Sequence, residues 1–234
     1  MKIPLSTRLL ACAQFVKKGD RVADIGCDHG YLSIHLLTNG IAKSCIASDV
    51  AEGPLQSAMR NARKYGVQEN ISFYLSDGVR NIPRDFDTLV CAGMGGDTMI
   101  HILDSAPWLQ NGQYRLILQC QSKRPELRKW LYDQGFAIRR ETLAQDGKFY
   151  YPVMEIVHAP GESLKGAEFY ITPALRASGS PLLPAFYDRV VGGIRTSVEG
   201  LARTGGEKYG EMKEILDELL EMRLTIKSQV LISG

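Results

Sequence analysis

Residues 22–32 (VADIGCDHGYL) constrain the fold more than any other stretch of this chain. An apolar run rich in β-forming residues leads into a turn with Gly26 and Gly30, and apolar residues then recur at helical spacing. The pattern is typical of a strand, a glycine loop and a helix. Glycine at the strand exit lets a ligand approach the backbone, and the helix start beyond it offers unpaired N–H groups. An ordinary turn without a ligand is the alternative.

The loop departs from the dinucleotide fingerprint G-x-G-x-x-G. Asp28 stands where the middle glycine would be. A carboxylate there disfavours a pyrophosphate, but it suits a ligand with a cationic amino acid end. The aminocarboxypropyl tail of S-adenosylmethionine is such a ligand.

Strands and helices alternate over the first 160 residues. Apolar runs bounded by turn residues predict strands, and periodic apolar residues with terminal Pro or Gly predict helices. The later strands are expected at residues 44–50, 71–75, 86–92 and 114–121, and the helices at 6–15, 31–37, 52–65, 97–103 and 125–132. Two β-rich runs, 136–144 and 149–158, flank a turn with Asp-Gly and predict a hairpin. We therefore expect an α/β fold with a doubly wound sheet and one reversed strand.

Polar and glycine residues follow several of these strands. Asp49 ends the second strand, where a carboxylate can accept both hydroxyl hydrogens of a ribose; a helix N-cap is the alternative. Asp77 lies in a Ser-Asp-Gly turn, where it suits an adenine amino group or a simple Asx turn. Residues 93–96 (GMGG) leave the fourth strand and indicate backbone passing close to a ligand. All these positions share the carboxyl edge of one sheet.

The composition excludes several classes of protein. The 28 basic and 26 acidic residues leave a net charge of +2, so any nucleic-acid surface must be a local patch. The five cysteines include no C-x-x-C pair, which suits reduced thiols in a cytoplasmic protein, and the four histidines show no zinc-ligand spacing. The N-terminus is too short and polar for a signal peptide, and no apolar run of about 18 residues occurs. We expect neither a membrane segment nor a structural metal.

The composition changes after residue 160. Residues 161–184 are rich in Gly, Ser and Pro and are expected to be a linker between a domain at 1–160 and one at 185–234. Helices are expected at 185–202 and 207–232, and the second is close to a heptad pattern. A short glycine turn between them predicts an antiparallel, coiled-coil-like hairpin. Packing or dimerisation are ordinary roles for such a hairpin; the expected state is a monomer.

The order of these motifs resembles the class I S-adenosylmethionine-dependent methyltransferases, whose Rossmann-like sheet has seven strands with a reversed one. VADIGCDHGYLSIHLL, ASDV, SDG, CAGMGG and LILQCQSKRPELRKWL, followed by a hairpin and C-terminal helices, resemble the TrmK family, whose members methylate N1 of adenosine 22 in tRNA. The resemblance covers almost the whole chain. It implies cofactor contacts at Asp24, Gly26, Asp28, Asp49, Val50, Asp77, Gly78, Ala92, Gly93 and Met94.

The resemblance also implies direct methyl transfer to a flipped base. The ring N1 has an in-plane lone pair, so alignment and electrostatics should suffice. Asp28 is the candidate to stabilise the cationic product, with His29 and Tyr31 as neighbours. A helix N-cap, or a contact to the cofactor ammonium alone, is the alternative for Asp28.

A tRNA substrate requires basic clusters that contact phosphates. Such clusters are expected at Lys123, Arg124, Arg128 and Lys129 and at Arg189 and Arg195. Charges on a solvated face are the alternative. Competing functions are a methyltransferase for another RNA site or a small molecule, a dinucleotide oxidoreductase, and a non-catalytic RNA-binding protein.

Overall fold

The computed structural model describes residues 3–203 and 205–232, and for residues 224–232 the backbone alone. The chain forms two compact units, Met1–Glu162 and Ser163–Gly234. Each unit is described by itself.

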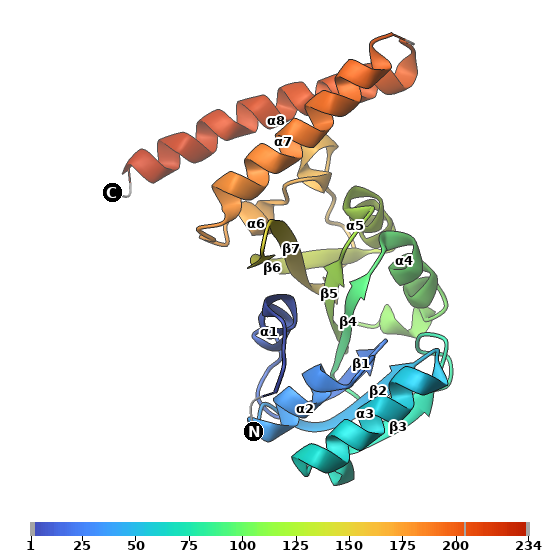
Figure 1. The fold of residues 1–234 in the computed structure, drawn as a ribbon. Helices are drawn as coiled ribbons and strands as arrows, with labels where there is room; N and C mark the ends of the chain where they lie inside the picture. The colour runs from blue at the N-terminus through green and yellow to red at the C-terminus, as the bar shows by residue number, and fades with distance from the viewer. Residues whose placement is uncertain (1–2, 204, 233–234) are drawn as a thin grey trace. The chain divides into compact units, whose positions relative to one another are not determined.

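The first unit is built on a seven-stranded sheet, which confirms the expected fold class (Figure 1). The strands are β1 (Asp20–Ile25), β2 (Ala42–Asp49), β3 (Ile71–Leu75), β4 (Thr88–Met94), β5 (Arg115–Cys120), β6 (Phe136–Asp146) and β7 (Phe149–His158). Their order is β3-β2-β1-β4-β5-β7-β6, and β7 runs antiparallel to both neighbours. The chain order reverses between β1 and β4, which are hydrogen-bonded in parallel. Open α/β sheets bind ligands at the carboxyl ends of the strands beside such a switch point.

Helices cover both faces of this sheet (Figure 1). One face carries α1 (Thr7–Ala13), α2 (Tyr31–Thr38) and α3 (Glu52–Tyr65), and the other carries α4 (Gly96–Asp104) and α5 (Arg124–Asp133). Short 3-10 turns lie at η1 (Gln68–Asn70) and η2 (Pro107–Leu109). The helices match the expected segments because their amphipathic spacing and Pro or Gly ends are local signals.

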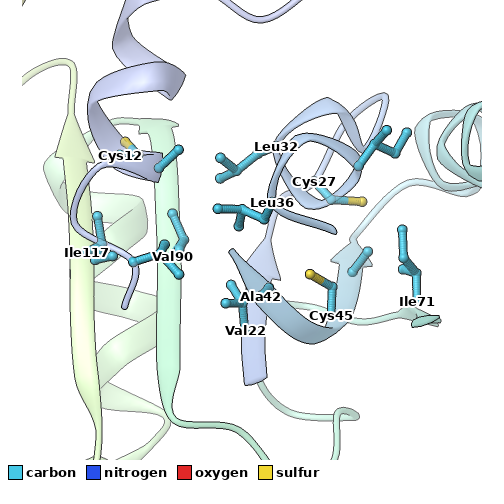
Figure 2. Packing of buried hydrophobic residues seen from close by; sticks show 14 of the residues in the cluster. Cys12, Val22, Cys27, Leu32, Leu36, Ala42, Cys45, Ile71, Val90 and Ile117 are labelled. Atoms are coloured by element: carbon cyan, nitrogen blue, oxygen red, sulfur yellow. The ribbon is translucent and has the colours of Figure 1, made fainter. Parts of the chain in front are cut away.

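The core on the first face positions the glycine loop. Leu32 and Leu36 of α2 are buried with Val22, Val90 and residues from α1, α3 and the neighbouring strands. Figure 2 shows these side chains gathered between the helices and the sheet, with Cys27 and Cys45 among them. All five cysteines are buried and free, as the sequence predicts. The start of α2 is thereby held directly over the end of β1.

The second unit contains η3 (Gly166–Phe169), α6 (Pro173–Arg176), α7 (Leu183–Leu201) and α8 (Glu207–Ile232). The two long helices pack as the predicted hairpin: the Tyr187 hydroxyl donates to the carbonyl of Leu219, and Arg223 pairs with Asp188 at 2.5 Å. Thr204, in the expected glycine turn, and the last two residues of the expected 185–234 domain lie outside the described residues.

The segment expected to be a linker at 161–184 is largely part of the second unit. The Ala167 N–H donates to Oε2 of Glu218 on α8 at 2.7 Å. Leu164, Ile171 and Leu175 are buried. Their apolar side chains are sparse among Gly, Ser and Pro, so local composition did not reveal that they pack.

Candidate active site

A cavity of about 410 Å³ opens at the carboxyl ends of β1, β2 and β4. Its volume is within the usual range for small-molecule sites. It is lined by all ten residues that the sequence assigns to a cofactor: Asp24, Gly26, Asp28, Asp49, Val50, Asp77, Gly78, Ala92, Gly93 and Met94. His29 and Tyr31 line it as well. Residues that lie up to 70 positions apart in the sequence, from Asp24 to Met94, therefore line the same cavity.

The glycine loop has a backbone that requires its glycines. Gly26 has φ +70°, and a Cβ there would lie 2.1 Å from Cε of Met94. Gly30, the N-cap of α2, has φ +71°, and its Cβ would lie 2.9 Å from Cβ of Ala58. Glycine adopts such left-handed conformations without steric cost. The loop can therefore turn tightly while the thioether of Met94 packs against it.

Asp24 is a buried carboxylate at the base of the cavity. It is 4% exposed, and the Ser33 hydroxyl donates to its Oδ2 at 2.8 Å. Burial raises the pKa of Asp24 to about 6, and the nearby charge of Asp49 acts in the same direction. At neutral pH this carboxylate is ionised at a cost in stability, which a bound cation would offset.

Asp49 is held by the backbone at the end of β2. Its Oδ2 accepts from the N–H of Asp28 at 3.1 Å, and its Oδ1 accepts from the N–H of Ala51 at 3.0 Å. Each carboxylate oxygen retains further acceptor capacity. Val50 beside it is 72% exposed and lines the cavity, where it offers an apolar surface to the flat face of a ring.

The Ser-Asp-Gly turn closes the cavity on the β3 side. Ser76 donates to the carbonyl of Gly78 at 2.9 Å, and a Cβ on Gly78 would lie 2.9 Å from Cγ1 of Ile102. The carboxylate of Asp77 pairs with Arg80 at 3.1 Å and lies 3.8 Å from His101. Half of the Asp77 side chain remains exposed, so it can also accept a hydrogen bond from a ligand.

The three residues predicted to act on the base lie together. The side chain of Asp28 is 72% exposed, and its Oδ1 lies 3.7 Å from Nε2 of His29. The His29 and Tyr31 rings are 5.8 Å apart between centroids. Asp28 has φ 51°, a left-handed conformation that Asp and Asn tolerate better than most residues. Its carboxylate is accessible to a large substrate.

The sequence did not single out the cavity residues from two helices. Arg8 and Leu9 come from α1, and Thr98 and Ile102 come from α4. The apolar spacing of α1 predicted a helix, but nothing local indicated that Arg8 would reach the end of β4. Only the packing of α1 onto the sheet brings it there.

The basic residues predicted to contact RNA differ in exposure. Lys123 and Lys129 are exposed and pair with Asp97 and Asp133, and Arg124 is half-buried. Arg189 and Arg195 lie on exposed positions of α7.

The structure contradicts the prediction that Arg128 contacts an RNA phosphate. Its side chain is 1% exposed and pairs with the buried Glu141 of β6. It cannot bind a phosphate, because the guanidinium lies inside the first unit. Arg128 lies among other basic residues on α5, and the local sequence does not show which face of that helix is buried.

The residues that line the cavity fit the charges and the shape of S-adenosylmethionine. Four carboxylates surround it, which suits a ligand with a sulfonium and an ammonium group. The exposed Val50 and the buried Ile102 supply apolar surface for an adenine ring. Among the described residues no cluster could hold a metal ion, and no described helix is long and apolar enough to cross a membrane.

Comparison with known proteins agrees with this fit. A methyltransferase-domain family model matches residues 5–154. The sheet order, the cavity and this match define the chain as a class I S-adenosylmethionine-dependent methyltransferase. One similar sequence and two similar crystal structures then narrow the class.

A Bacillus subtilis tRNA (adenine(22)-N(1))-methyltransferase is 37% identical over 64% of this chain and 63% of its own length. The crystal structure of the B. subtilis tRNA methyltransferase TrmK matches with a TM-score of 0.78 and 28% identity, over 97% of this chain and 99% of that one. A candidate tRNA methyltransferase from Streptococcus pneumoniae, solved with S-adenosyl-L-methionine, is 31% identical with a TM-score of 0.78, over 91% and 99%. The chain belongs to the TrmK family, as the sequence predicts.

Proposed function

We propose that this protein transfers a methyl group from S-adenosylmethionine to N1 of adenosine 22 in tRNA. The observation that carries the proposal is that the acidic residues of the β1, β2 and β3 ends meet Gly93 of β4 in one cavity. Membership of the TrmK family supports the substrate. A cytoplasmic, monomeric enzyme accords with a tRNA substrate and remains part of the proposal.

The direct test is incubation of the purified protein with unmodified tRNA and methyl-labelled cofactor, followed by nucleoside analysis. We expect N1-methyladenosine, lost when adenosine 22 is replaced. Label in another nucleoside or another position would contradict the substrate. Cofactor binding without methylation of any tRNA would favour a small-molecule substrate.

Different residues of the cavity contact different parts of the cofactor in this proposal. Asp24 binds the ammonium of the amino acid tail, Asp49 accepts from the ribose hydroxyls, and Asp77 with Gly78 contacts the adenine. Ala92, Gly93 and Met94 line the cavity and would lie beside the reactive methyl group of the bound cofactor. When bound, the cofactor supplies an electrophilic methyl group on a sulfonium. No residue has to remove a proton from N1, because its lone pair is already available.

Asp28 acts on the target base in this proposal. Its exposed carboxylate can accept a hydrogen bond from the adenine amino group and stabilise the positive charge that N1-methylation creates. Its backbone N–H is anchored on Asp49, so the cofactor site and the base site share one loop. Unstacking the base costs a few kcal/mol, which contacts to the rest of the tRNA must supply.

Asp28→Asn should lower kcat on tRNA by about 10- to 100-fold and leave the Kd for S-adenosylmethionine unchanged. Asn fits the same backbone conformation, so the change removes mainly the charge. Steady-state kinetics and calorimetry measure the two effects. Asp104→Asn, an exposed change outside the cavity, is the control. Full turnover by Asp28→Asn would limit Asp28 to a structural or cofactor role.

The helical hairpin of the second unit contributes a tRNA-binding surface in this proposal. Arg189 and Arg195 are exposed on α7, whose buried face is formed by other residues such as Phe186 and Val191. Lys123, Arg124 and Lys129 offer a second basic surface on the first unit. Phosphate contacts of this kind position an RNA without reading its bases.

Arg189→Glu/Arg195→Glu should weaken tRNA binding by roughly 10-fold or more and reduce the slope of log K against log salt by about 2. Filter binding over a range of salt concentrations measures both. Cofactor affinity should not change. Arg60→Glu/Arg63→Glu, on exposed positions of α3, makes the same change in net charge and serves as the control. Equal loss in both variants would mean that only the overall charge matters.

A further inference from the structure

The β6–β7 hairpin projects past the edge of the sheet where the parallel strands end and the cavity opens. β7 runs antiparallel to β5 and pairs Met154 with Leu118. Phe149, five residues earlier in β7, therefore stands beyond Cys120, the last residue of β5. β5 alone separates β7 from β4, and neighbouring strands lie about 4.8 Å apart. The hairpin tip is thus only two strands away from β4, whose end lines the cavity.

Helix α1 holds the hairpin beside the cavity. The Thr7 hydroxyl donates to the carbonyl of Gln145 at 2.9 Å, and the two residues that follow Thr7 line the cavity. Tyr151 of β7 packs against the core cluster that contains the buried residues of α1. Side chains alternate along a strand, so Phe149 is on the same face of the hairpin as Tyr151. The ring of Phe149 therefore lies on the face of the hairpin that α1 contacts.

The hairpin tip presents an aromatic ring and a cation side by side. Phe149 is 48% exposed, and Nζ of Lys148 lies 5.6 Å from the centroid of its ring. Proteins that bind single-stranded nucleic acid combine aromatic rings, on which bases stack, with basic groups that contact the phosphates. Asp146, which is also exposed, offsets the charge of Lys148. We therefore expect stacking, rather than charge, to carry a contact with RNA at this position.

The proposed reaction makes a base available for such stacking. N1 of an adenine can enter the cavity only after its nucleotide leaves the base stack, and the neighbouring base then loses a stacking partner. We propose that Phe149 stacks on the base of a nucleotide adjacent to adenosine 22 and so positions the RNA with its target at the cavity. The inference rests on the proposed function, because it names a further contact with the same substrate. Phe149 is a positioning residue here and does not touch the reacting atoms.

Phe149→Ala should weaken tRNA binding by about 5- to 50-fold, because the stacking surface is lost. Phe149→Trp retains that surface and should bind tRNA within about 2-fold of the unaltered protein, whereas Phe149→Leu retains only apolar bulk and should lose most of the affinity. The slope of log K against log salt should not change, because no phosphate contact is removed. Leu75→Ala, which truncates an exposed apolar residue of β3 at the opposite edge of the sheet, is the matched control.

Removal of a single base from the RNA tests the contact directly. Transcripts that are abasic on either side of adenosine 22 are compared with the unaltered transcript, each with the unaltered protein and with Phe149→Ala. On one of the two abasic transcripts, we expect Phe149→Ala to cost less than about 2-fold, because the base that it would stack on is already missing. An equal loss on all three transcripts overturns the inference, since the effect would not depend on a neighbouring base.

The remaining outcomes separate this inference from the proposed function. Unchanged tRNA affinity of Phe149→Ala overturns the inference alone, provided that the unaltered protein methylates tRNA. If the unaltered protein methylates no tRNA, the proposed function fails and this inference fails with it. Loss of a dimer in Phe149→Ala, measured by sedimentation of the free protein, would assign the ring to a contact between two copies of this chain and also overturns the inference. Unchanged affinity for S-adenosylmethionine shows that each variant is folded.

Discussion

Asp24→Asn should stabilise the protein without cofactor and weaken cofactor binding. The pKa of Asp24 is raised from 3.8 to about 6 by burial, so its contribution to stability is fully present below pH 4 and is lost as the pH rises through 6. Above pH 6 the ionised carboxylate costs up to about 3 kcal/mol. Asn is neutral at every pH and avoids this cost. We expect a gain of about 1–3 kcal/mol at pH 7.5 that disappears near pH 4.

The same substitution should weaken S-adenosylmethionine binding by about 100-fold, because the ammonium loses its buried partner. Urea denaturation at pH 7.5 and pH 4 measures the stability, and calorimetry measures the affinity. For the unaltered protein, affinity should fall below pH 6, where Asp24 takes up a proton. Destabilisation of the variant at pH 7.5 would contradict the assignment, since it would mean that the carboxylate serves the fold.

Arg128→Met should lower the free energy of unfolding by about 3–5 kcal/mol, because it leaves Glu141 charged and buried without its guanidinium partner. The double variant Arg128→Met/Glu141→Leu should recover most of this loss, since apolar residues can replace a buried ion pair at little cost. Denaturation curves of the single and double variants measure the coupling.

Measurement of tRNA binding distinguishes the buried Arg128 from the exposed basic residues. The double variant should bind tRNA as the unaltered protein does, whereas the exposed Lys129, although paired with Asp133, can reach an RNA phosphate. A stable double variant with weak tRNA binding would show that Arg128 reaches the RNA after all.

Much of the candidate site could be predicted because its signals are local. Gly26 and Gly30 adopt a left-handed backbone that favours glycine, and Asp24, Asp49 and Asp77 lie at or close to the ends of apolar runs that are visible in the sequence. Parallel strands place their carboxyl ends at one edge, so residues far apart in the chain could be assigned to one site. In the structure Asp24, Gly26, Asp49 and Asp77 all line one cavity.

The sequence by itself determined the strands, the helices, their alternation and the strand-end residues, because periodicity and turn chemistry depend on near neighbours. Only the tertiary structure decided three further points. It packed residues 163–182 with the C-terminal helices, buried Arg128 against Glu141, and carried Arg8 to Gln119 and the cavity. Each depends on contacts between residues distant in the chain, and the same residue type in the same local pattern can face either solvent or a partner.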